Sequence, residues 1–251
     1  TRNRISVQTG IKSTGRINFL EIAPTLQDGH ACGFTSAGDV SLSQRDIETA
    51  TIKVNLDICP ETLRGKYAEY LISTNATEDA LPFEGEIVEG LVKDINKQVE
   101  KKVWEKLGKD SSVRGVSLTE AATAYDKVMA TYMAMDERVL EDGVIFVSPT
   151  MFREYVKNLV EKNLYHYNPA DGSLEEIFIP GAGVKVRKAN GLTGNVIYGT
   201  SPKNMLYATD FMGNAEEVKV WFSDDNDTYR VKVRFNYGAA FIFPELVVKG
   251  E

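Results

Sequence analysis

The sequence predicts a mixed α+β fold, and three patterns predict it. Apolar residues recur at every fourth position over residues 81–107, which is the period of one face of a helix. Apolar and polar residues alternate over residues 39–58 and again over residues 218–235, which is the period of a strand with two different faces. A chain of 251 residues is long enough to bury one large core or two modest ones.

The helix predicted at residues 81–107 is long and amphipathic. Pro82 suits its first turn, and Gly108 is placed to end it. At about 1.5 Å per residue it extends for about 35 to 40 Å, so we expect it to act as a strut. One face is charged, and the apolar stripe on the other consists of Ile87, Leu91, Ile95, Val99, Val103 and Leu107, with Val88, Val92 and Trp104 beside them.

The sequence before this helix has the pattern of a projecting arm. Residues 1–38 are interrupted by glycines, and within them only residues 17–22 are long enough for a strand. Residues 39–58 alternate at both ends but are polar on both faces over residues 43–51, so the middle of this ribbon would bury nothing in a domain core. We therefore expect an extended β-arm that projects from the body.

Two geometries are open for this arm. Either the chain turns near Arg45 and Asp46 into a short hairpin, or one long strand descends from a loop near residues 24–37. The second geometry is favoured, because Asp28-Gly29 supplies a turn signal in that loop and no such dipeptide lies near residue 45.

Two further helices are predicted on either side of the strut. A short helix is expected at residues 61–74, after Pro60. Ser117 and Glu120 have the spacing of a capping box, so we expect a second helix to begin at Ser117. Three methionines at helical spacing are expected to fill a core or a groove; they are Met129, Met133 and Met135.

A buried strand followed by a capped helix is predicted next. Residues 144–147 are all apolar, which is typical of a central strand. Ser148 is the expected cap of a third helix, with Pro149 at its first position and an end near Leu164. Residues 181–183 form a Gly-Ala-Gly segment, which we interpret as a bend between two strands.

The last part of the chain predicts strands only. Short strands are expected at residues 195–198 and 205–209. The alternating segments of residues 218–235 are joined by a polar turn at residues 223–228, which is the pattern of a β-hairpin. Residues 241–248 predict a final apolar strand.

No pattern of chemically reactive residues stands out. Cys32, Cys59, His30 and His166 lack the close ligand pairs of a zinc site, and the two thiols are expected to be buried. The acidic turn at residues 224–227 lacks the glycine and the terminal glutamate of a calcium loop. A nucleophile elbow and a phosphate-binding glycine loop are also missing from the sequence, so we predict no catalytic, cofactor-binding or metal-binding residue.

The charge pattern disfavours a nucleic-acid-binding protein. The formal net charge is -7, and Lys and Arg do not form a run on any predicted face. Both observations argue against a protein that binds the phosphates of nucleic acid directly. An apolar run of about 18 residues and a basic leader are both missing from the sequence, so neither a membrane span nor a signal peptide is expected.

The order of these elements resembles the major capsid protein of tailed bacteriophages, the Hong Kong ninety-seven type of shell subunit. Four segments carry the resemblance: Gly38 to Pro60 (GDVSLSQRDIETATIKVNLDICP), Leu81-Pro82-Phe83-Glu84, Gly143 to Met151 (GVIFVSPTM), and Leu206 to Pro244 around Trp221. The block of Arg45, Lys53 to Asn55 and Cys59-Pro60 is most similar to capsid proteins of phages that infect Bacteroidetes, including the crAss-like group.

The resemblance implies four parts of the subunit. Residues 1–58 would be the N-terminal arm and extended β-loop, and residues 59–108 the peripheral domain with its spine helix. Residues 109–215 would be the axial domain, and residues 216–251 the closing hairpin and last strand of the peripheral domain. An interface between subunits would include residues of the extended loop, namely Val40, Leu42, Arg45, Ile47 and Glu48.

The resemblance also implies a function and partners. The chain would be a structural shell subunit that forms pentamers and hexamers with itself and encloses DNA in an icosahedral capsid, without binding the DNA specifically. Portal and scaffolding or protease proteins would be its partners, with no membrane, no cofactor and no enzyme activity. The protein would be found in the virion, and in the host cytoplasm during assembly.

Two other functions are considered. A bacterial nanocompartment shell of the encapsulin kind is built on the same fold, and a cargo peptide on its inner wall would distinguish it. An intracellular hydrolase or thiol enzyme that uses Cys32 or Cys59 is disfavoured, because the sequence has no paired base for either thiol.

Overall fold

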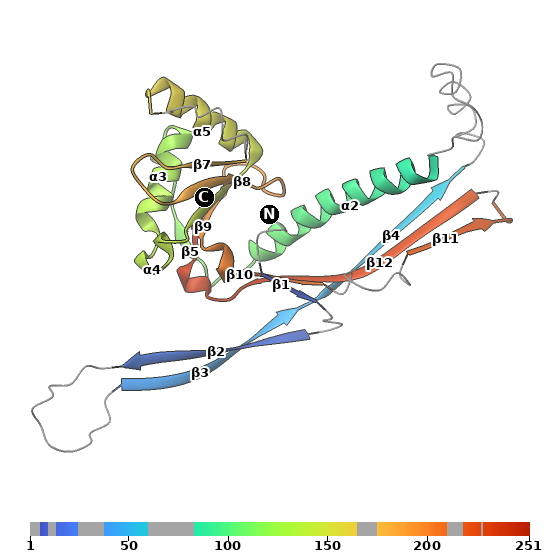
Figure 1. The fold of residues 1–251 in the computed structure, drawn as a ribbon, viewed down its shortest axis with the longest axis horizontal. Coiled ribbons are helices and arrows are strands. Elements are labelled where there is room, and N and C mark those ends of the chain that lie inside the picture. Colours follow the sequence, from blue (N-terminus) through green and yellow to red (C-terminus); the bar gives the residue numbers. More distant parts are fainter. Residues whose placement is uncertain are drawn as a thin grey trace, which may run out of the picture.

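The computed structural model describes residues 6–9, 14–24, 38–59, 83–164, 175–209, 218–226 and 228–251. Figure 1 shows a compact lobe of helices and short strands, a long helix that leaves it beside several long strands, and a separate two-stranded arm. In the part of the chain that is described, no helix combines the length and the apolar character that a membrane crossing needs.

A five-stranded sheet forms the elongated part of the molecule. Its central strand is β12 (Thr228–Phe241), which pairs with β4 (Ala50–Ile58) along one edge. The opposite edge pairs with β11 (Val218–Ser223) and then with β10 (Met205–Thr209). The short strand β1 (Ser6–Thr9) lies parallel to β10. The predicted hairpin of β11 and β12 is confirmed, and β12 is longer than expected.

A six-stranded sheet forms the centre of the compact lobe. Its strand order is β5-β13-β9-β6-β8-β7. The strands are β5 (Arg114–Val116), β13 (Val248–Gly250), β9 (Ile197–Thr200), β6 (Val144–Val147), β8 (Lys185–Lys188) and β7 (Glu176–Phe178). The lobe also contains the helices α3 (Ala124–Ala134), α4 (Glu137–Leu140) and α5 (Pro149–Glu161). The 3-10 turns η2 (Pro202–Asn204) and η4 (Pro244–Leu246) connect the two sheets.

The arm is a two-stranded antiparallel ribbon. Strand β2 (Thr14–Pro24) pairs along its full length with β3 (Gly38–Glu48). A single residue outside both strands, Thr49, separates β3 from β4, so the chain runs from the arm straight into the five-stranded sheet. The favoured geometry is confirmed for its strand, which runs over residues 38–58 with one interruption at Thr49, whereas residues 25–37 of the expected loop lie outside the described residues. Strand β2 is longer than the expected residues 17–22.

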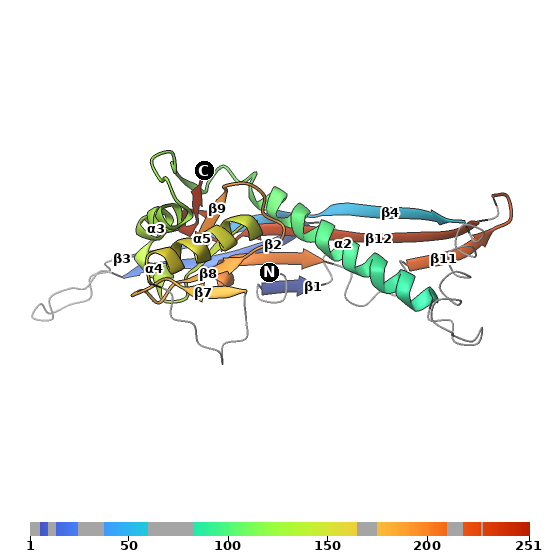
Figure 2. The same ribbon diagram turned by 90° about the horizontal axis from the view of Figure 1, so that it is seen from above.

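The strut is the helix α2 (Phe83–Leu107), and it ends as predicted. The amide of Gly108 donates to the carbonyl of Trp104 at 2.9 Å, which closes the last turn. The apolar stripe is buried at the C-terminal end, over Val99, Val103, Trp104 and Leu107, whereas Val92 is 46% exposed. Figure 2 shows α2 lying across one face of the long strands.

Trp104 joins the two sheets into one core. Its ring centroid lies 5.2 Å from that of Phe146 in β6 and 5.4 Å from that of Tyr198 in β9. The same cluster of buried residues includes Phe235 of the five-stranded sheet. Gly191 must remain a glycine here, because a Cβ atom would lie 2.5 Å from the carbonyl oxygen of Glu100.

The second helix begins later than predicted. Helix α3 is capped by Thr123, whose side chain accepts from the amide of Asp126 in a reciprocal capping box, whereas Ser117 hydrogen-bonds to Thr119. The predicted cap at Ser117 is wrong because the backbone that follows it binds the C-terminal segment instead of starting a helix. The amide of Leu118 donates to the carbonyl of Glu251 at 3.0 Å, beside β13.

The third helix and its strand are as predicted, apart from one end. All residues of β6 are buried, and Ser148 caps α5 by accepting from the amide of Met151 at 3.3 Å. Helix α5 ends at Glu161 instead of Leu164, and Asn163 has the left-handed backbone angle φ of 55° that stops a helix. The bend at residues 181–183 does lie between two strands.

Several other predictions are wrong or lie outside the described residues. The predicted last strand at 241–248 is divided, since Phe241 ends β12 and β13 belongs to the other sheet.

Met133 is 77% exposed instead of filling a core, and the thiol of Cys59 is exposed instead of buried. The helix expected at residues 61–74 lies outside the described residues, as do Cys32, His30 and His166.

Replacing Trp104 by Ala should destabilise the fold strongly. The substitution leaves a cavity where the two sheets meet, and such aromatic truncations cost about 3 to 5 kcal/mol of unfolding free energy. The measurement is urea unfolding followed by circular dichroism. Met133→Ala is the matched control on an exposed helix position and should change the unfolding free energy by less than about 0.5 kcal/mol. Equal stability of the two variants would contradict the role of Trp104.

Candidate assembly surfaces

The arm exposes apolar side chains along strand β3. Val40 is 63% exposed and Leu42 is 69% exposed. Both lie on the same face of the strand, because residues two apart share a face. In the register of the ribbon they stand opposite Ile22 and Leu20. Exposed apolar residues at consecutive positions of one face are the kind of surface that a partner covers.

The base of the arm is anchored by Ile47. Its side chain is 1% exposed and packs in a small cluster with Leu206 and Ala208 of β10. Gly238 of β12 allows the approach, because a Cβ atom there would lie 3.2 Å from Cγ2 of Ile47 and 3.0 Å from the carbonyl oxygen of Glu48. The arm is therefore fixed to the five-stranded sheet at this residue.

Two polar contacts hold the arm base to the end of α2. The guanidinium of Arg45 forms an ion pair with Asp110, and both side chains are largely shielded, at 25% and 15% exposed. The ammonium of Lys106 donates to the backbone carbonyl of Glu48. Burial lowers the pKa of Lys106 below its ordinary value. We call Arg45, Ile47 and Glu48, with their partners Lys106 and Asp110, the arm anchor.

The five predicted interface residues therefore divide into two groups. Val40 and Leu42 lie outward on the arm, in agreement with an interface. Ile47 is a core residue of its own chain, and Arg45 is bound to Asp110. Glu48 is exposed, but its carbonyl belongs to the arm anchor. Sequence patterns missed the anchor because Arg45 and Asp110 are 65 residues apart and Asp110 lies in a loop.

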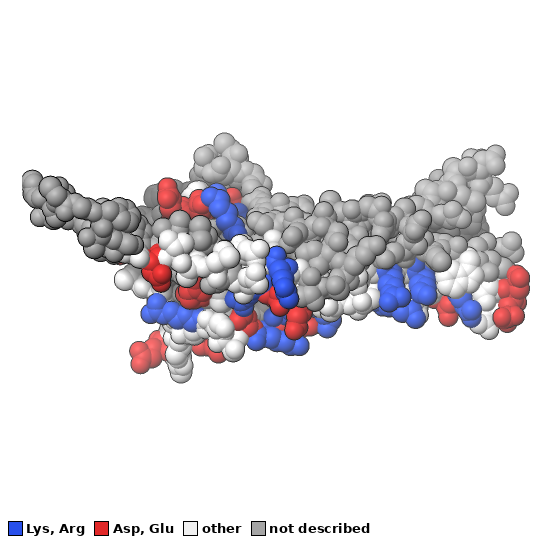
Figure 3. Space-filling view, turned by 90° about the horizontal axis from the view of Figure 1, so that it is seen from below, with Lys and Arg blue, Asp and Glu red and all other residues white. Residues whose placement is uncertain are grey.

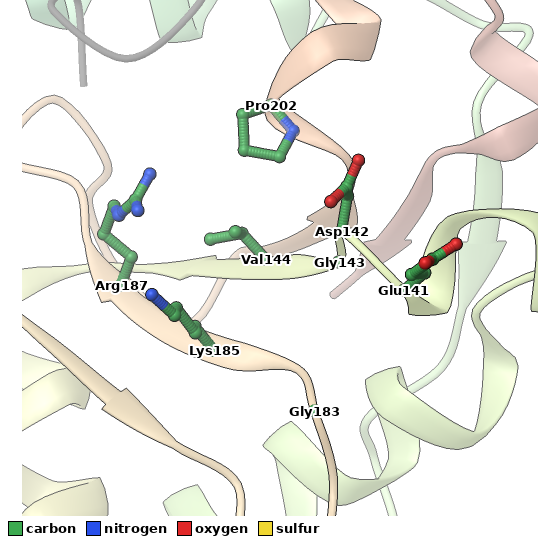
Figure 4. Close-up of a pocket in the computed structure, with 8 residues that line it drawn as sticks. All are labelled: Glu141, Asp142, Gly143, Val144, Gly183, Lys185, Arg187 and Pro202. Atoms are coloured by element: carbon green, nitrogen blue, oxygen red, sulfur yellow. The ribbon is translucent and has the colours of Figure 1, made fainter.

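A charged pocket lies on the compact lobe. It has a volume of about 230 Å³, and Figure 4 shows Asp142 and Glu141 on one side of it, with Lys185 and Arg187 on the other. Three of these four charges, those of Asp142, Lys185 and Arg187, have partners within the chain. Glu176 accepts from Lys185 at 3.1 Å and from Arg187 at 2.6 Å, while Lys203 pairs with Asp142.

The ion pairs around Glu176 hold the edge of the six-stranded sheet. Glu176 of β7 stands opposite Arg187 of β8 in the strand register. Burial raises the pKa of Glu176, but the hydrogen bonds from Arg187 and Lys185 outweigh it and lower the pKa to about 2. The pocket is thus a structural cluster in which opposite charges neutralise one another.

Comparison with known proteins identifies the fold. No family model and no curated protein matches the chain. Solved structures do match across nearly its full length, and the fold is the mixed α+β fold of Hong Kong ninety-seven type capsid structures. The satellite phage P4 procapsid including size determination (Sid) protein is 12% identical, covers 99% of this chain and 85% of that chain, and has a TM-score of 0.63.

Two further structures show the same fold. The capsid of an empty GTA particle computed with C5 symmetry is 11% identical, with a TM-score of 0.61, and the match covers 99% of this chain and 88% of that chain. The virus-like particle from Pyrococcus furiosus is 11% identical, with a TM-score of 0.54 and coverage of 99% and 90%. At these identities the likeness establishes the fold.

Replacing Ile47 by Ala should loosen the arm from the body. Removing a buried isoleucine side chain costs about 2 to 5 kcal/mol, so amide exchange through local opening of β3 and β4 should rise at least about tenfold. Hydrogen–deuterium exchange read by mass spectrometry measures it. Leu42→Ala, on the same strand but exposed, should leave the exchange of the unassembled protein unchanged. An unchanged rate in the Ile47 variant would show that the anchor does not hold the arm.

The Glu176 cluster should make stability depend on pH below neutrality. Because the pKa of Glu176 is about 2 in the fold against an ordinary 4.5, its carboxylate stabilises the fold above pH 4.5, and this contribution is lost as the pH falls toward 2. Glu176→Gln should therefore be less stable than the parent at pH 7 and nearly as stable close to pH 2. Urea unfolding across this range tests it, with the exposed pocket residue replaced in Glu141→Gln as the control. A difference that does not depend on pH would refute the assignment.

Proposed function

We propose that the chain is the major capsid protein of a phage or prophage, which self-assembles into an icosahedral shell that encloses DNA. Support comes first from the fold, which is shared over nearly the whole chain with structures described as a procapsid and a capsid. The observation that carries the proposal is the arm, a projecting ribbon with Val40 and Leu42 exposed on one face.

The physics of the arm supports assembly with other copies. An isolated two-stranded ribbon is at best marginally stable in water and needs a third strand or a packing partner. Within the described residues, β2 and β3 pair only with each other, and the body holds the ribbon at its base around Ile47. The outer part of the arm, with Val40 and Leu42, is therefore a surface that becomes stable when another subunit covers it.

The remaining parts of the proposal follow the shell fold. The proposed arm and extended loop comprise residues 1–58, of which β1 and β4 belong to the five-stranded sheet. The spine helix lies in residues 59–108. Residues 109–215 are an axial domain around the symmetry axes, apart from β10, which also belongs to the five-stranded sheet. Residues 216–251 close the peripheral domain, except that β13 pairs within the sheet of the lobe.

The proposed assembly consists of pentamers and hexamers, with portal and scaffolding or protease proteins as partners. The enclosed DNA is not bound specifically, and the protein resides in the virion after assembly in the host cytoplasm. The finer likeness to capsid proteins of Bacteroidetes-infecting phages, including the crAss-like group, stays a prediction from the blocks around Arg45, Lys53 and Cys59.

A nanocompartment shell is the second candidate function. It would have the same fold, and the chain also shares its fold with a particle described as virus-like, from Pyrococcus furiosus, at a TM-score of 0.54. A cargo protein enclosed in shells isolated from the native source would support this candidate, whereas enclosed DNA would support the capsid.

Electron microscopy of the purified chain tests the proposal. We expect closed shells or capsomer rings, and we expect Val40→Asp with Leu42→Asp to abolish them while the circular dichroism of the subunit stays the same, because a carboxylate is costly to bury at an apolar contact. Gln44→Ser, a polar replacement on the same exposed face, is the control and should assemble normally. A parent protein that stays monomeric across salt and crowding conditions would refute the proposal.

A further inference from the structure

Arg45 and Ile47 attach the arm to the body from the same side of strand β3. Residues two apart in a strand share a face, so the exposed Val40 and Leu42 lie on the opposite face. Ile47 is buried against β10, while Arg45 reaches Asp110 beyond the end of α2. The two residues are about 7 Å apart along the strand, at about 3.4 Å per residue. Two separate points of attachment define a direction, whereas a single contact would leave the arm free to swing.

The carboxylate of Asp110 binds two parts of the chain at once. Its Oδ2 accepts from the guanidinium of Arg45, and its Oδ1 accepts from the amide of Ser112 at 3.1 Å. The second of these hydrogen bonds shapes the loop by which the chain leaves α2. The amide of Asp110 itself donates to the carbonyl of Leu107, in the last turn of the helix, at 3.3 Å. Asp110 is therefore tied to the strut, to its own loop and to the arm.

The loop of Asp110 continues directly into the compact lobe. Arg114 begins strand β5, which pairs with β13 in the six-stranded sheet. Its amide donates to the carbonyl of Val247 at 3.1 Å, and its guanidinium donates to the carbonyl of Ala134 at 3.3 Å. Only three residues separate Asp110 from Arg114. The contact of Arg45 with Asp110 therefore sets the arm with respect to the lobe as well as to the long sheet.

Stability alone does not explain the choice of an ion pair at this place. The side chains of Arg45 and Asp110 are 25% and 15% exposed, so both charges lose most of their hydration. The cost of removing two charges from water offsets their attraction, and an apolar pair of similar volume often stabilises a protein as well or better. What an ion pair adds is geometry, because a guanidinium and a carboxylate bind strongly only in a defined relative orientation.

The wider surface does not orient the arm. In Figure 1 the arm lies on the side of the five-stranded sheet opposite α2, and Figure 3 shows the molecule from that side. Over the described residues, Lys and Arg side chains are interspersed there with Asp and Glu. Charges of both signs, screened by salt over about 8 to 10 Å, do not pull the ribbon in one direction. The direction of the arm therefore depends on the contacts at its base.

An arm that is oriented in advance favours uniform assembly. Association of two copies has to overcome the entropy that is lost when a mobile segment becomes ordered, and a segment that is already ordered avoids this cost. A closed shell also repeats the same contact many times, and closure requires a fixed rotation between copies. A spread of arm directions would give contacts at different angles, and hence particles of different size.

We propose that the pair of Arg45 and Asp110 is a positioning contact for assembly. It fixes the direction of the arm relative to the lobe in the single subunit and thereby keeps the shells uniform in size. This inference rests on the proposed function, and it concerns the subunit before any neighbour is bound. Both residues act through the arm rather than by contact with another copy.

Distances between two spin labels test the orientation in single subunits. With Cys32→Ser and Cys59→Ser as the background, one label is attached on the arm through Ser41→Cys and the other on α5 through Glu154→Cys, both at exposed positions. Pulsed electron paramagnetic resonance of the dilute, unassembled chain then measures the distance between arm and lobe. The parent sequence in this background should give one narrow distance distribution.

Loss of either partner should free the arm. Arg45→Gln and Asp110→Asn should each replace the single maximum by a broad distribution, and the second variant keeps an oxygen that can accept from Ser112. The double variant should be no broader than either single variant, since both remove the same contact. Arg16→Gln is the matched control, because it removes the same charge from an exposed ion pair with Asp46 within the ribbon, and it should keep the narrow distribution. Circular dichroism checks that every variant is folded.

Electron microscopy of assembled protein tests the consequence. The yield of shells with the parent's diameter should fall about tenfold or more in Arg45→Gln, because a hydrogen bond between charged groups changes a local equilibrium by about that factor. Particles of other sizes should replace them, whereas Arg16→Gln should give the parent's shells. An unchanged distance distribution in Arg45→Gln would overturn the inference, and so would uniform shells from a variant whose distribution is broad. A parent chain that forms no shells would overturn the proposed function instead, and the distances in single subunits distinguish the two failures.

Discussion

The burial of Trp104 is the constraint on which the whole shape depends. The indole lies where the strut helix ends and contacts aromatic rings of the lobe at Phe146 and Tyr198, while its cluster extends into the long sheet. Its N–H has no hydrogen-bond partner among the described residues, so packing alone positions the ring. Because both sheets share this one core, the lobe and the elongated part behave as one body rather than as two domains on a linker.

Strand β12 extends from that core into the elongated part of the molecule. It pairs with β4 on one edge and with β11 and β10 on the other, so segments from the two ends of the chain meet on one strand. One face of β12 is covered by α2, and the other carries Arg230, Lys232 and Arg234. The same strand thus contributes apolar side chains to the core with one face and charged side chains to the surface with the other.

Local patterns predicted the elements that depend on local physics. The strut, the buried strand at residues 144–147 and the closing hairpin follow from periodicity, and the cap at Ser148 follows from its hydroxyl. Prediction failed where hydrogen bonds to backbone far away in the sequence determine the local structure. Ser117 has the right spacing for a cap, but the C-terminal strand binds the adjacent backbone of Leu118.

The same limit applies to the candidate site. Exposure of Val40 and Leu42 was predictable, because the sequence pattern of the ribbon leaves no face that a core of the same chain would cover. The anchor at Ile47 and Arg45 was not, because the partners of these residues lie far away in the sequence. Arg230, Lys232 and Arg234 alternate along the predicted strand and could be seen in the sequence, whereas the place of Lys53 opposite Arg234 depends on the register of β4 with β12.

The arm acts as a lever whose fixed end is the anchor at Ile47. From the anchor at Ile47 to Gly38 the arm extends over nine residues, which is about 30 Å at about 3.4 Å per residue. A change of only about 10° in the direction of the ribbon beyond this anchor moves Gly38 by about 5 Å, roughly the spacing between paired strands. Small bends of the ribbon therefore suffice to change which residues of a neighbour the arm would meet in the proposed shell, while the anchor and the body stay as they are.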